Sequence, residues 1–130
     1  MVGTDIIEVD RIEKLIKEKG DKFLNRIYTQ NEIDYCESKG PNKYQHYAGR
    51  FAAKEAVFKV IQSNNTSKSL MFKDIQILNK DDGSPYVNIV SSNHTISSRI
   101  YISISHIKEY ATAIAVEKWL KILTYQILQL

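Results

Sequence analysis

The chain has 130 residues, of which 43% are hydrophobic and 25% are charged, and its formal net charge is +3. These are ordinary values for one globular domain, and the length leaves little room for a second. The net charge is too small to indicate nucleic-acid binding by itself, although clustered cations would favour an acidic partner. A single cysteine, Cys36, excludes an intrachain disulfide and a cysteine-based metal site.

The chain begins with an apolar run over residues 2–9 that is short and rich in β-branched side chains, which predicts a buried strand. Asp5 interrupts this run. Because an unpaired carboxylate is costly in a protein interior, Asp5 is expected to cap a helix, to pair with a buried cation or to bind a metal. The run by itself leaves these three roles open.

Residues 9–19 carry apolar side chains at helical spacing and are followed by Gly20, which predicts a helix that ends there. Residues 23–28 predict another helical turn or two. Basic side chains lie beside apolar ones in both segments, which suits docking of an acidic partner helix with an apolar ridge. A merely solvated basic face is an equal alternative.

Two local signals place the next helices. Thr29 and Glu32 form a capping box, which predicts a short helix through about Ser38. Gly and Pro at positions 40–41 end that helix, and a longer central helix is predicted from about Lys43.

The central helix carries an apolar face and a cluster of charges over residues 49–60. Its predicted buried face consists of Ala53, Ala56, Val57 and Val60. Glu55 and Lys59 are four residues apart on a different side, and Arg50 and Lys54 form a second such pair on the flank. Three cations around one carboxylate outline a site for a polyanion, whereas an ordinary surface ion pair is the alternative interpretation.

The second half of the chain predicts strands, because the apolar period falls to two. Residues 74–77 and 86–90 form a predicted hairpin across residues 81–85. Residues 100–104 and 110–116 predict two further strands joined by a turn. With helices first and antiparallel strands later, the class is α+β: a short N-terminal strand and helices packed on a mainly antiparallel sheet.

The last residues differ in composition from the rest. Residues 119–130 are apolar on nearly all sides and too few to span a bilayer, so a packed or partner-covered helix is expected. We therefore divide the chain into a domain over residues 1–118 and a C-terminal apolar tail over residues 119–130.

Asp5 and Glu55 are the candidate metal ligands. Two carboxylates without His or Cys companions suit a hard cation such as Mg²⁺, whose remaining ligands are usually water and substrate phosphate. Arg50 and Lys54 would hold the remaining phosphate charge, so a phosphate or diphosphate substrate is predicted. A P-loop is excluded because its motif is missing. His106, at a strand end, is as often a satisfied structural histidine as a ligand.

Four stretches, in order and with similar spacing, resemble the successive motifs of the holo-acyl-carrier-protein synthases, the small trimeric 4′-phosphopantetheinyl transferases. They are Gly3-Thr4-Asp5-Ile6-Ile7-Glu8-Val9 with Arg11-Ile12, Gly49-Arg50-Phe51-Ala52-Ala53-Lys54-Glu55-Ala56 with Lys59, Asp82-Gly83-Ser84-Pro85-Tyr86, and Ser103-Ile104-Ser105-His106 with Tyr110-Ala111. The joint occurrence of the first two stretches is highly specific. The chain departs from the family at Phe58 and at residues 62–65, where a small residue and a glycine-rich turn are common.

The resemblance implies the 4′-phosphopantetheinyl transferase fold and transfer of 4′-phosphopantetheine from coenzyme A to a serine of acyl carrier protein, releasing adenosine 3′,5′-bisphosphate. In this family the residues that match Asp5 and Glu55 bind magnesium, and the one that matches Lys59 contacts the pyrophosphate. We therefore expect these three residues to be catalytic, with Glu55 or a water that it orients as the base.

The same resemblance assigns residues to coenzyme A and to a second subunit. Arg50 and His106 match positions at the nucleotide end of coenzyme A, and Gly83 and Pro85 match a hairpin that lies against it. The family forms a homotrimer with active sites at the subunit interfaces, so His106 would serve a neighbouring chain's site.

The carrier protein is expected to dock on the first helices through Arg11 and Lys14, helped by Phe23 and Arg26. No nucleic-acid or membrane partner is expected. A bacterial cytoplasmic location is expected because the chain enters its first strand without a leader, with a plastid-type organelle as the alternative if a leader has been removed. The alternative functions are a non-catalytic nucleotide- or RNA-binding α+β module and a non-catalytic oligomerisation domain, neither of which would need the two carboxylates.

Overall fold

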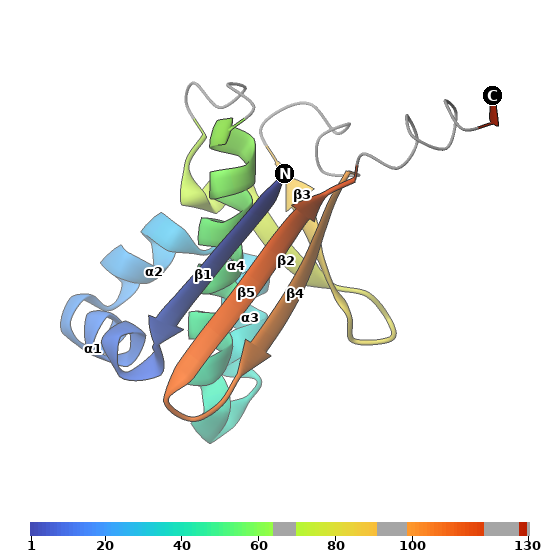
Figure 1. The fold of residues 1–130 in the computed structure, drawn as a ribbon. Helices are drawn as coiled ribbons and strands as arrows, with labels where there is room; N and C mark the ends of the chain where they lie inside the picture. Colours follow the sequence, from blue (N-terminus) through green and yellow to red (C-terminus); the bar gives the residue numbers. More distant parts are fainter. Residues whose placement is uncertain (64–69, 91–98, 119–127, 130) are drawn as a thin grey trace.

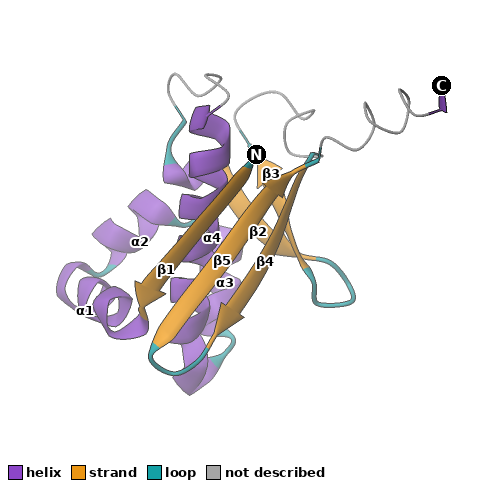
Figure 2. Cartoon of the chain, in the orientation of Figure 1, coloured by secondary structure: helices purple, strands orange, loops and turns teal. Residues whose placement is uncertain are grey.

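The computed structural model describes residues 1–63, 70–90, 99–118 and 128–129 (Figure 1). In chain order the elements are β1 (Val2–Glu8), α1 (Val9–Lys19), α2 (Asp21–Ile27), α3 (Gln30–Glu37), the 3₁₀ turn η1 (Gly40–Asn42), α4 (Lys43–Ser63), the 3₁₀ turn η2 (Phe72–Asp74), β2 (Ile75–Asn79), β3 (Pro85–Ile89), β4 (Ile100–His106) and β5 (Tyr110–Glu117). The strands form an antiparallel sheet in the order β1-β5-β4 and a separate hairpin, β2-β3. The helices lie on one side of the three-stranded sheet, with α4 directly behind it (Figure 2). The predicted α+β class is confirmed.

The predicted helix signals are confirmed. Helix α1 is followed by Gly20, whose φ of 54° lies in the left-handed region that favours glycine. At the start of α3 the Thr29 N–H donates to Glu32 Oε1 at 2.8 Å, and the Glu32 N–H donates to Thr29 Oγ1 at 3.4 Å. This reciprocal pair is the predicted capping box.

The predicted strands are confirmed as well. Ile75 pairs with Ile89 and Asn79 with Pro85 in the hairpin, so the two runs face each other as expected. Strand β4 runs two residues further than the predicted strand, to His106, and its isoleucines lie on the more buried face. The connector at 91–98 and the C-terminal tail, except positions 128–129, lie outside the described residues, so the proposed division after residue 118 stays a prediction.

The predicted burial of β1 holds for one of its two faces. Its side chains alternate, so that Gly3, Asp5 and Ile7 face α4 while Val2 and Ile6 are 63% and 67% exposed. Within one chain, only the face toward α4 is covered.

Small side chains make up the contact between α4 and the three-stranded sheet. The buried alanines, none more than 3% exposed, are Ala48, Ala52, Ala53 and Ala56 on α4 and Ala111, Ala113 and Ala115 on β5. Because alanine keeps the two backbones close, the helix lies tightly against the middle strand of the sheet. The predicted buried face of α4 is therefore confirmed, and its partner surface is the alanine row of β5.

Gly3 of β1 lies directly against the backbone of Ala56 on α4. A Cβ atom placed on Gly3 would lie 2.1 Å from the Ala56 carbonyl oxygen, closer than any real contact. Only glycine fits here, because the obstacle is backbone and cannot rotate away. The absence of a side chain at this position therefore sets the distance between β1 and α4.

We expect Gly3→Ala to destabilise the fold, because the added methyl group must push β1 away from α4. Forcing extra volume into a packed core costs about 1–3 kcal/mol. Urea unfolding at one fixed protein concentration measures this loss. Thr4→Ala, on the exposed face of the same strand, is the matched control and should cost less than about 1 kcal/mol; equal stability of the two variants would contradict the steric explanation.

Candidate active site

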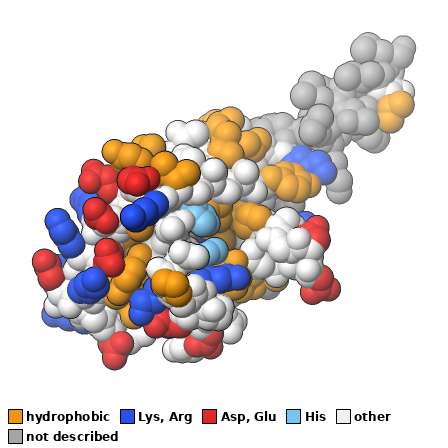
Figure 3. Space-filling model, turned by 90° about the horizontal axis from the view of Figure 1, so that it is seen from below, with side chains coloured by type: hydrophobic (Ala, Val, Ile, Leu, Met, Phe, Trp, Pro, Cys, Tyr) orange, Lys and Arg blue, Asp and Glu red, His pale blue; other side chains and the backbone are white. Residues whose placement is uncertain are grey.

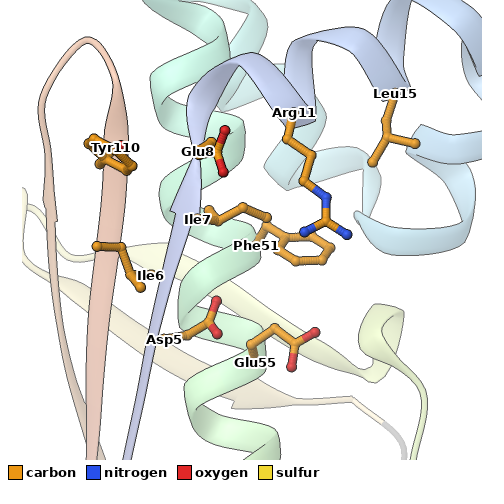
Figure 4. Close-up of a pocket in the computed structure, with 9 residues that line it drawn as sticks. All are labelled: Asp5, Ile6, Ile7, Glu8, Arg11, Leu15, Phe51, Glu55 and Tyr110. Atoms are coloured by element: carbon orange, nitrogen blue, oxygen red, sulfur yellow. The ribbon is translucent and has the colours of Figure 1, made fainter.

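The structure brings Asp5 and Glu55 into one pocket of about 320 Å³. This first pocket is lined by Asp5, Ile6, Ile7, Glu8, Arg11, Leu15, Phe51, Glu55 and Tyr110. Asp5 reaches it from β1 and Glu55 from α4, and the two side chains lie next to each other in the pocket (Figure 4). Two acidic residues that are fifty positions apart in the sequence therefore share one site.

The charges of this pocket are unbalanced. Partial burial and then the nearby charge of Asp5 raise the pKa of Glu55, while the Lys59 ammonium opposes the rise. Lys59 Nζ donates to the Thr4 carbonyl oxygen at 2.7 Å and lies 3.5 Å from Asp5 Oδ1. One ammonium group thus serves two carboxylates, and the pair would gain from a further cation.

The donor set fits a hard divalent cation. Carboxylate oxygens are the ligands that Mg²⁺ prefers, and Mg²⁺ is usually held by one or two of them together with water and substrate phosphate. Within residues 1–63, 70–90, 99–118 and 128–129 no group of three or more His, Cys, Asp or Glu side chains could hold a metal. Asp5 and Glu55 would therefore leave most coordination positions to substrate and solvent.

A second pocket, of about 150 Å³, gathers the residues that the sequence assigned to the nucleotide end of the substrate. It is lined by Tyr35, His46, Gly49, Arg50, Asn79, Gly83, Pro85, Ile104 and His106. Arg50, Gly83, Pro85 and His106 thus line one pocket within a single chain. The first pocket lies beside β1 and the second beside β4, which are opposite edges of the three-stranded sheet.

Hydrogen bonds fix the second pocket to its surroundings. Arg50 Nη2 donates to Asn79 Oδ1, and Asn79 Nδ2 donates to the Gly83 carbonyl oxygen at 2.9 Å, so α4 is joined to the hairpin turn. Gly83 has a φ of 88°, which suits glycine at this turn. The Arg50 guanidinium also lies 3.8 Å from the ring centre of Tyr35 on α3.

Residues 1–115 match the model of the 4′-phosphopantetheinyl transferase superfamily. A holo-[acyl-carrier-protein] synthase of Ruminiclostridium cellulolyticum is 45% identical over 121 residues, covering 89% of this chain and 90% of that protein. The chain belongs to the holo-acyl-carrier-protein synthases.

Solved structures agree with this family. The crystal structure of the Helicobacter pylori synthase in complex with coenzyme A has a TM-score of 0.76 and 32% identity, covering 91% of this chain and 100% of that one. The Bacillus anthracis synthase, in complex with CoA (3′,5′-ADP), has a TM-score of 0.67 and 41% identity, covering 90% and 95%. The fold and the enzyme class predicted from the sequence are confirmed. The alternative of a non-catalytic nucleotide- or RNA-binding module does not agree with membership of this enzyme family.

Lys54 of this synthase is not where the sequence analysis placed it. Its ammonium group is fully buried and donates to Glu32 Oε1 at 2.7 Å and to the carbonyl oxygens of Phe72 and Ile75 at 3.0 and 2.6 Å. Its three protons are all used, so none is left for a phosphate. The prediction of three α4 cations around Glu55 is therefore wrong: Lys54 and Arg50 face other partners, and of these three only Lys59 lies beside the carboxylates.

The predicted docking residues lie on α1 and α2 with different exposures. Arg11 lines the first pocket, Lys14 is exposed one turn further along α1, and Arg26 is exposed on α2. Phe23 is half-buried and packs edge to face against Tyr28 with ring centres 6.3 Å apart. Phe23 therefore packs α2 against the core and is also partly accessible at the surface.

Sequence reasoning missed residues whose partners are distant in the chain. Glu32 was assigned to a capping box only, yet its second oxygen also accepts from the Ile77 N–H at 2.9 Å and its first holds Lys54. Asn79 and His46 gave no motif at all. The capping-box position of Glu32 gave no signal of its other partners, because they lie on α4 and β2.

We expect Lys54→Met to destabilise the synthase strongly, because it leaves Glu32 buried without its cation. Breaking a buried ion pair by removing one partner costs about 3–5 kcal/mol. Thermal or urea unfolding measures the loss. The matched control is Lys59→Met on the same helix, whose ion pair with Asp5 is exposed and worth less than about 1 kcal/mol. A Lys54 variant as stable as the Lys59 variant would show that the buried pair does not hold α3 to α4.

Proposed function

We propose that this chain is a magnesium-dependent synthase in which Asp5 and Glu55 hold the metal against the diphosphate of coenzyme A. The observation that carries the proposal is the meeting of these two carboxylates in one open pocket with Lys59 beside them. The reaction of the family forms a bond between a carrier-protein serine oxygen and the phosphorus that bears pantetheine, and it breaks that phosphorus's bond to adenosine 3′,5′-bisphosphate.

In this reaction the residues of the first pocket have distinct tasks. Bound between the carboxylates, the metal would neutralise diphosphate oxygens and make the phosphorus more electrophilic. Lys59, which is half-exposed and reaches over β1, offsets negative charge on the leaving group. Glu55, or a water that it orients, takes the proton of the serine hydroxyl.

The nucleotide end of coenzyme A is assigned to the second pocket. Arg50 and His106 supply the polar groups there, while Gly83 and Pro85 form its wall on the hairpin side. The Arg50 side chain is held by Asn79 and Tyr35, so it is positioned before substrate binds. Lys54 is not assigned to the substrate, because all of its ammonium protons are used in buried hydrogen bonds.

A homotrimer with active sites between subunits is supported by the outer face of the sheet. That face exposes Val2, Ile6, Tyr101, Tyr110, Ile114 and Val116, each at least 37% accessible. An exposed apolar sheet face of this kind is typical of a protein–protein interface. The two pockets lie at opposite edges of the same sheet, which suits sites completed by a neighbouring copy.

Carrier-protein docking on α1 is supported by the position of Arg11. Its guanidinium group points from α1 into the pocket that contains Asp5 and Glu55 (Figure 4). An acidic helix bound by Arg11 and Lys14 would therefore bring its serine close to the reacting phosphorus. The Ruminiclostridium cellulolyticum, Helicobacter pylori and Bacillus anthracis synthases are bacterial, which supports the cytoplasmic location we propose. None of the described helices is long and apolar enough to cross a membrane.

We expect Asp5→Asn and Glu55→Gln each to lower the transfer rate by at least about a hundredfold, because even outer-shell partners of metal ligands are worth about 10–100-fold. Intact mass of apo carrier protein incubated with coenzyme A and magnesium detects the added phosphopantetheine. The control is Glu13→Gln, a carboxylate of α1 that is paired with Lys17. Full activity of either ligand variant over a magnesium titration would remove the metal assignment.

We expect Lys14→Glu to raise the KM for carrier protein about threefold to tenfold, because one exposed ion pair is lost and repulsion replaces it. The KM for coenzyme A should stay unchanged, since Lys14 lies outside both pockets. Lys14→Gln should give an intermediate KM, and the effect should shrink at high salt. Steady-state kinetics with each substrate varied in turn measures this, and an unchanged KM for carrier protein would exclude docking through Lys14.

A further inference from the structure

The second pocket contains a residue to which the family resemblance gives no role. His46 lies one helical turn before Arg50 on α4 and lines the pocket together with His106. No carboxylate is among the lining residues. Histidine side chains therefore reach the surface beside Lys or Arg side chains on this side of the molecule (Figure 3).

The two imidazoles are in direct contact. The ring centres of His46 and His106 are 4.8 Å apart with an angle of 66° between the rings. His46 also packs edge to face on Tyr35, with ring centres 5.7 Å apart. On the other side, His106 Nδ1 lies 2.9 Å from Gln45 Oε1, which fixes the ring's orientation. The position of His46 is thus determined by α3, α4 and β4 together.

The groups that face His46 disfavour its charged form. They are Tyr35 on α3, Lys39 after α3, Arg50 on α4 and His106 on β4, and none of them is acidic. Burial, and then the nearby His106, Lys39 and Arg50, lower the pKa of His46 to about 4. His46 is therefore a neutral imidazole at physiological pH in a pocket that is otherwise positive.

A second, independent feature also points to an anionic ligand. Arg50 is only 4% exposed, and its Nε is a buried nitrogen with no hydrogen-bond partner in the described structure. Its Nη2 is satisfied by Asn79, so the guanidinium has a donor left for an acceptor that the chain itself does not supply. Two imidazoles beside such a guanidinium favour a phosphate group over an uncharged ligand.

Coenzyme A offers one phosphate of the right kind. Its diphosphate is assigned to the first pocket, which leaves the phosphomonoester on the ribose. We infer that His46 takes up a proton when that phosphomonoester binds, so that His46 makes coenzyme A affinity higher below neutral pH. This inference rests on the proposed function, because it assumes that coenzyme A occupies the second pocket.

The sign of the pH effect follows from linkage. An anion next to His46 stabilises the imidazolium, so the pKa of His46 is higher in the complex than in the free protein. Between the two values binding takes up a proton, and the contribution of His46 to affinity falls as pH rises. The phosphomonoester itself has a pKa near 6 and acts in the opposite direction when it becomes a monoanion, so only a comparison of variants isolates His46.

The test is calorimetric titration of the protein with coenzyme A and magnesium, in two buffers that differ in ionisation enthalpy, with wild type, His46→Phe and His46→Gln. We expect both variants to take up fewer protons than wild type. They should bind coenzyme A about tenfold more weakly near pH 6, with the difference fading toward pH 8. A tenfold effect at pH 6 corresponds to a pKa of His46 of about 7 in the complex, because each pH unit below that value is worth a factor of ten. Phe keeps the ring contacts with Tyr35 and His106, so lost packing does not account for its effect.

Titration with 3′-dephospho-coenzyme A separates the possible causes. It should give the same proton uptake in all three proteins. The inference would be overturned if wild type and variants took up equal numbers of protons on binding coenzyme A. It would also be overturned if the variants showed the same deficit in proton uptake with both ligands. Either result would leave the transferase proposal intact. Failure of wild type to bind coenzyme A at all would instead remove the proposed function.

Direct observation of wild type covers the case in which the variants do not fold. Among the three histidines of the chain, proton NMR should show one whose pKa lies well below the ordinary value in the free protein and rises on addition of coenzyme A. Assignment by either variant, or by contact with the Tyr35 and His106 ring protons, identifies it as His46. A His46 signal that titrates identically with and without coenzyme A would contradict the inference.

Discussion

The close approach of β1 to α4 is the constraint on which the rest of this structure depends. Gly3 lies against the Ala56 carbonyl with no space for a methyl group, and the alanine rows of α4 and β5 continue the same tight contact across the sheet. Because Asp5 follows Gly3 by two residues, it lies on the same inward face of the strand and is held beside Glu55. The two carboxylates repel each other, so it is the packing of small residues that keeps them together.

Helix α4 places neighbouring polar residues in separate environments. Lys54 points into the core, where the pair with Glu32 joins α4 to α3 and to the start of β2. The adjacent Glu55 points into the first pocket, and Arg50, one turn earlier, points to the hairpin. Since successive residues of a helix are about 100° apart, adjacent charged residues on one helix need not share a site. The buried pair fixes the rotation of α4 about its axis, and this rotation decides which residues reach each pocket.

Division of charge between the two pockets matches the chemistry of the family. The first pocket is dominated by carboxylates and suits a cation that a diphosphate can share. The second has histidines and arginine without acidic groups and suits a bare phosphate. The apolar outer face of the sheet lies between these two edges, and a neighbouring copy packed there would bring pockets of different subunits together. Assembly and substrate binding would then depend on the same strands.

Local signals in the sequence determined most of the secondary structure: the capping box at Thr29, the stop at Gly20, the alanine face of α4 and the period-two strands all follow from short-range geometry. The meeting of Asp5 and Glu55 in one pocket was also accessible, because the family resemblance assigned both residues to one metal site. The buried contacts of Lys54 and the roles of Glu32, Asn79 and His46 could not be predicted from the sequence. Helical spacing shows which residues of one helix are neighbours, but the partner that each side chain meets belongs to another element, and only the tertiary packing of α3, β2 and β4 on α4 decides it.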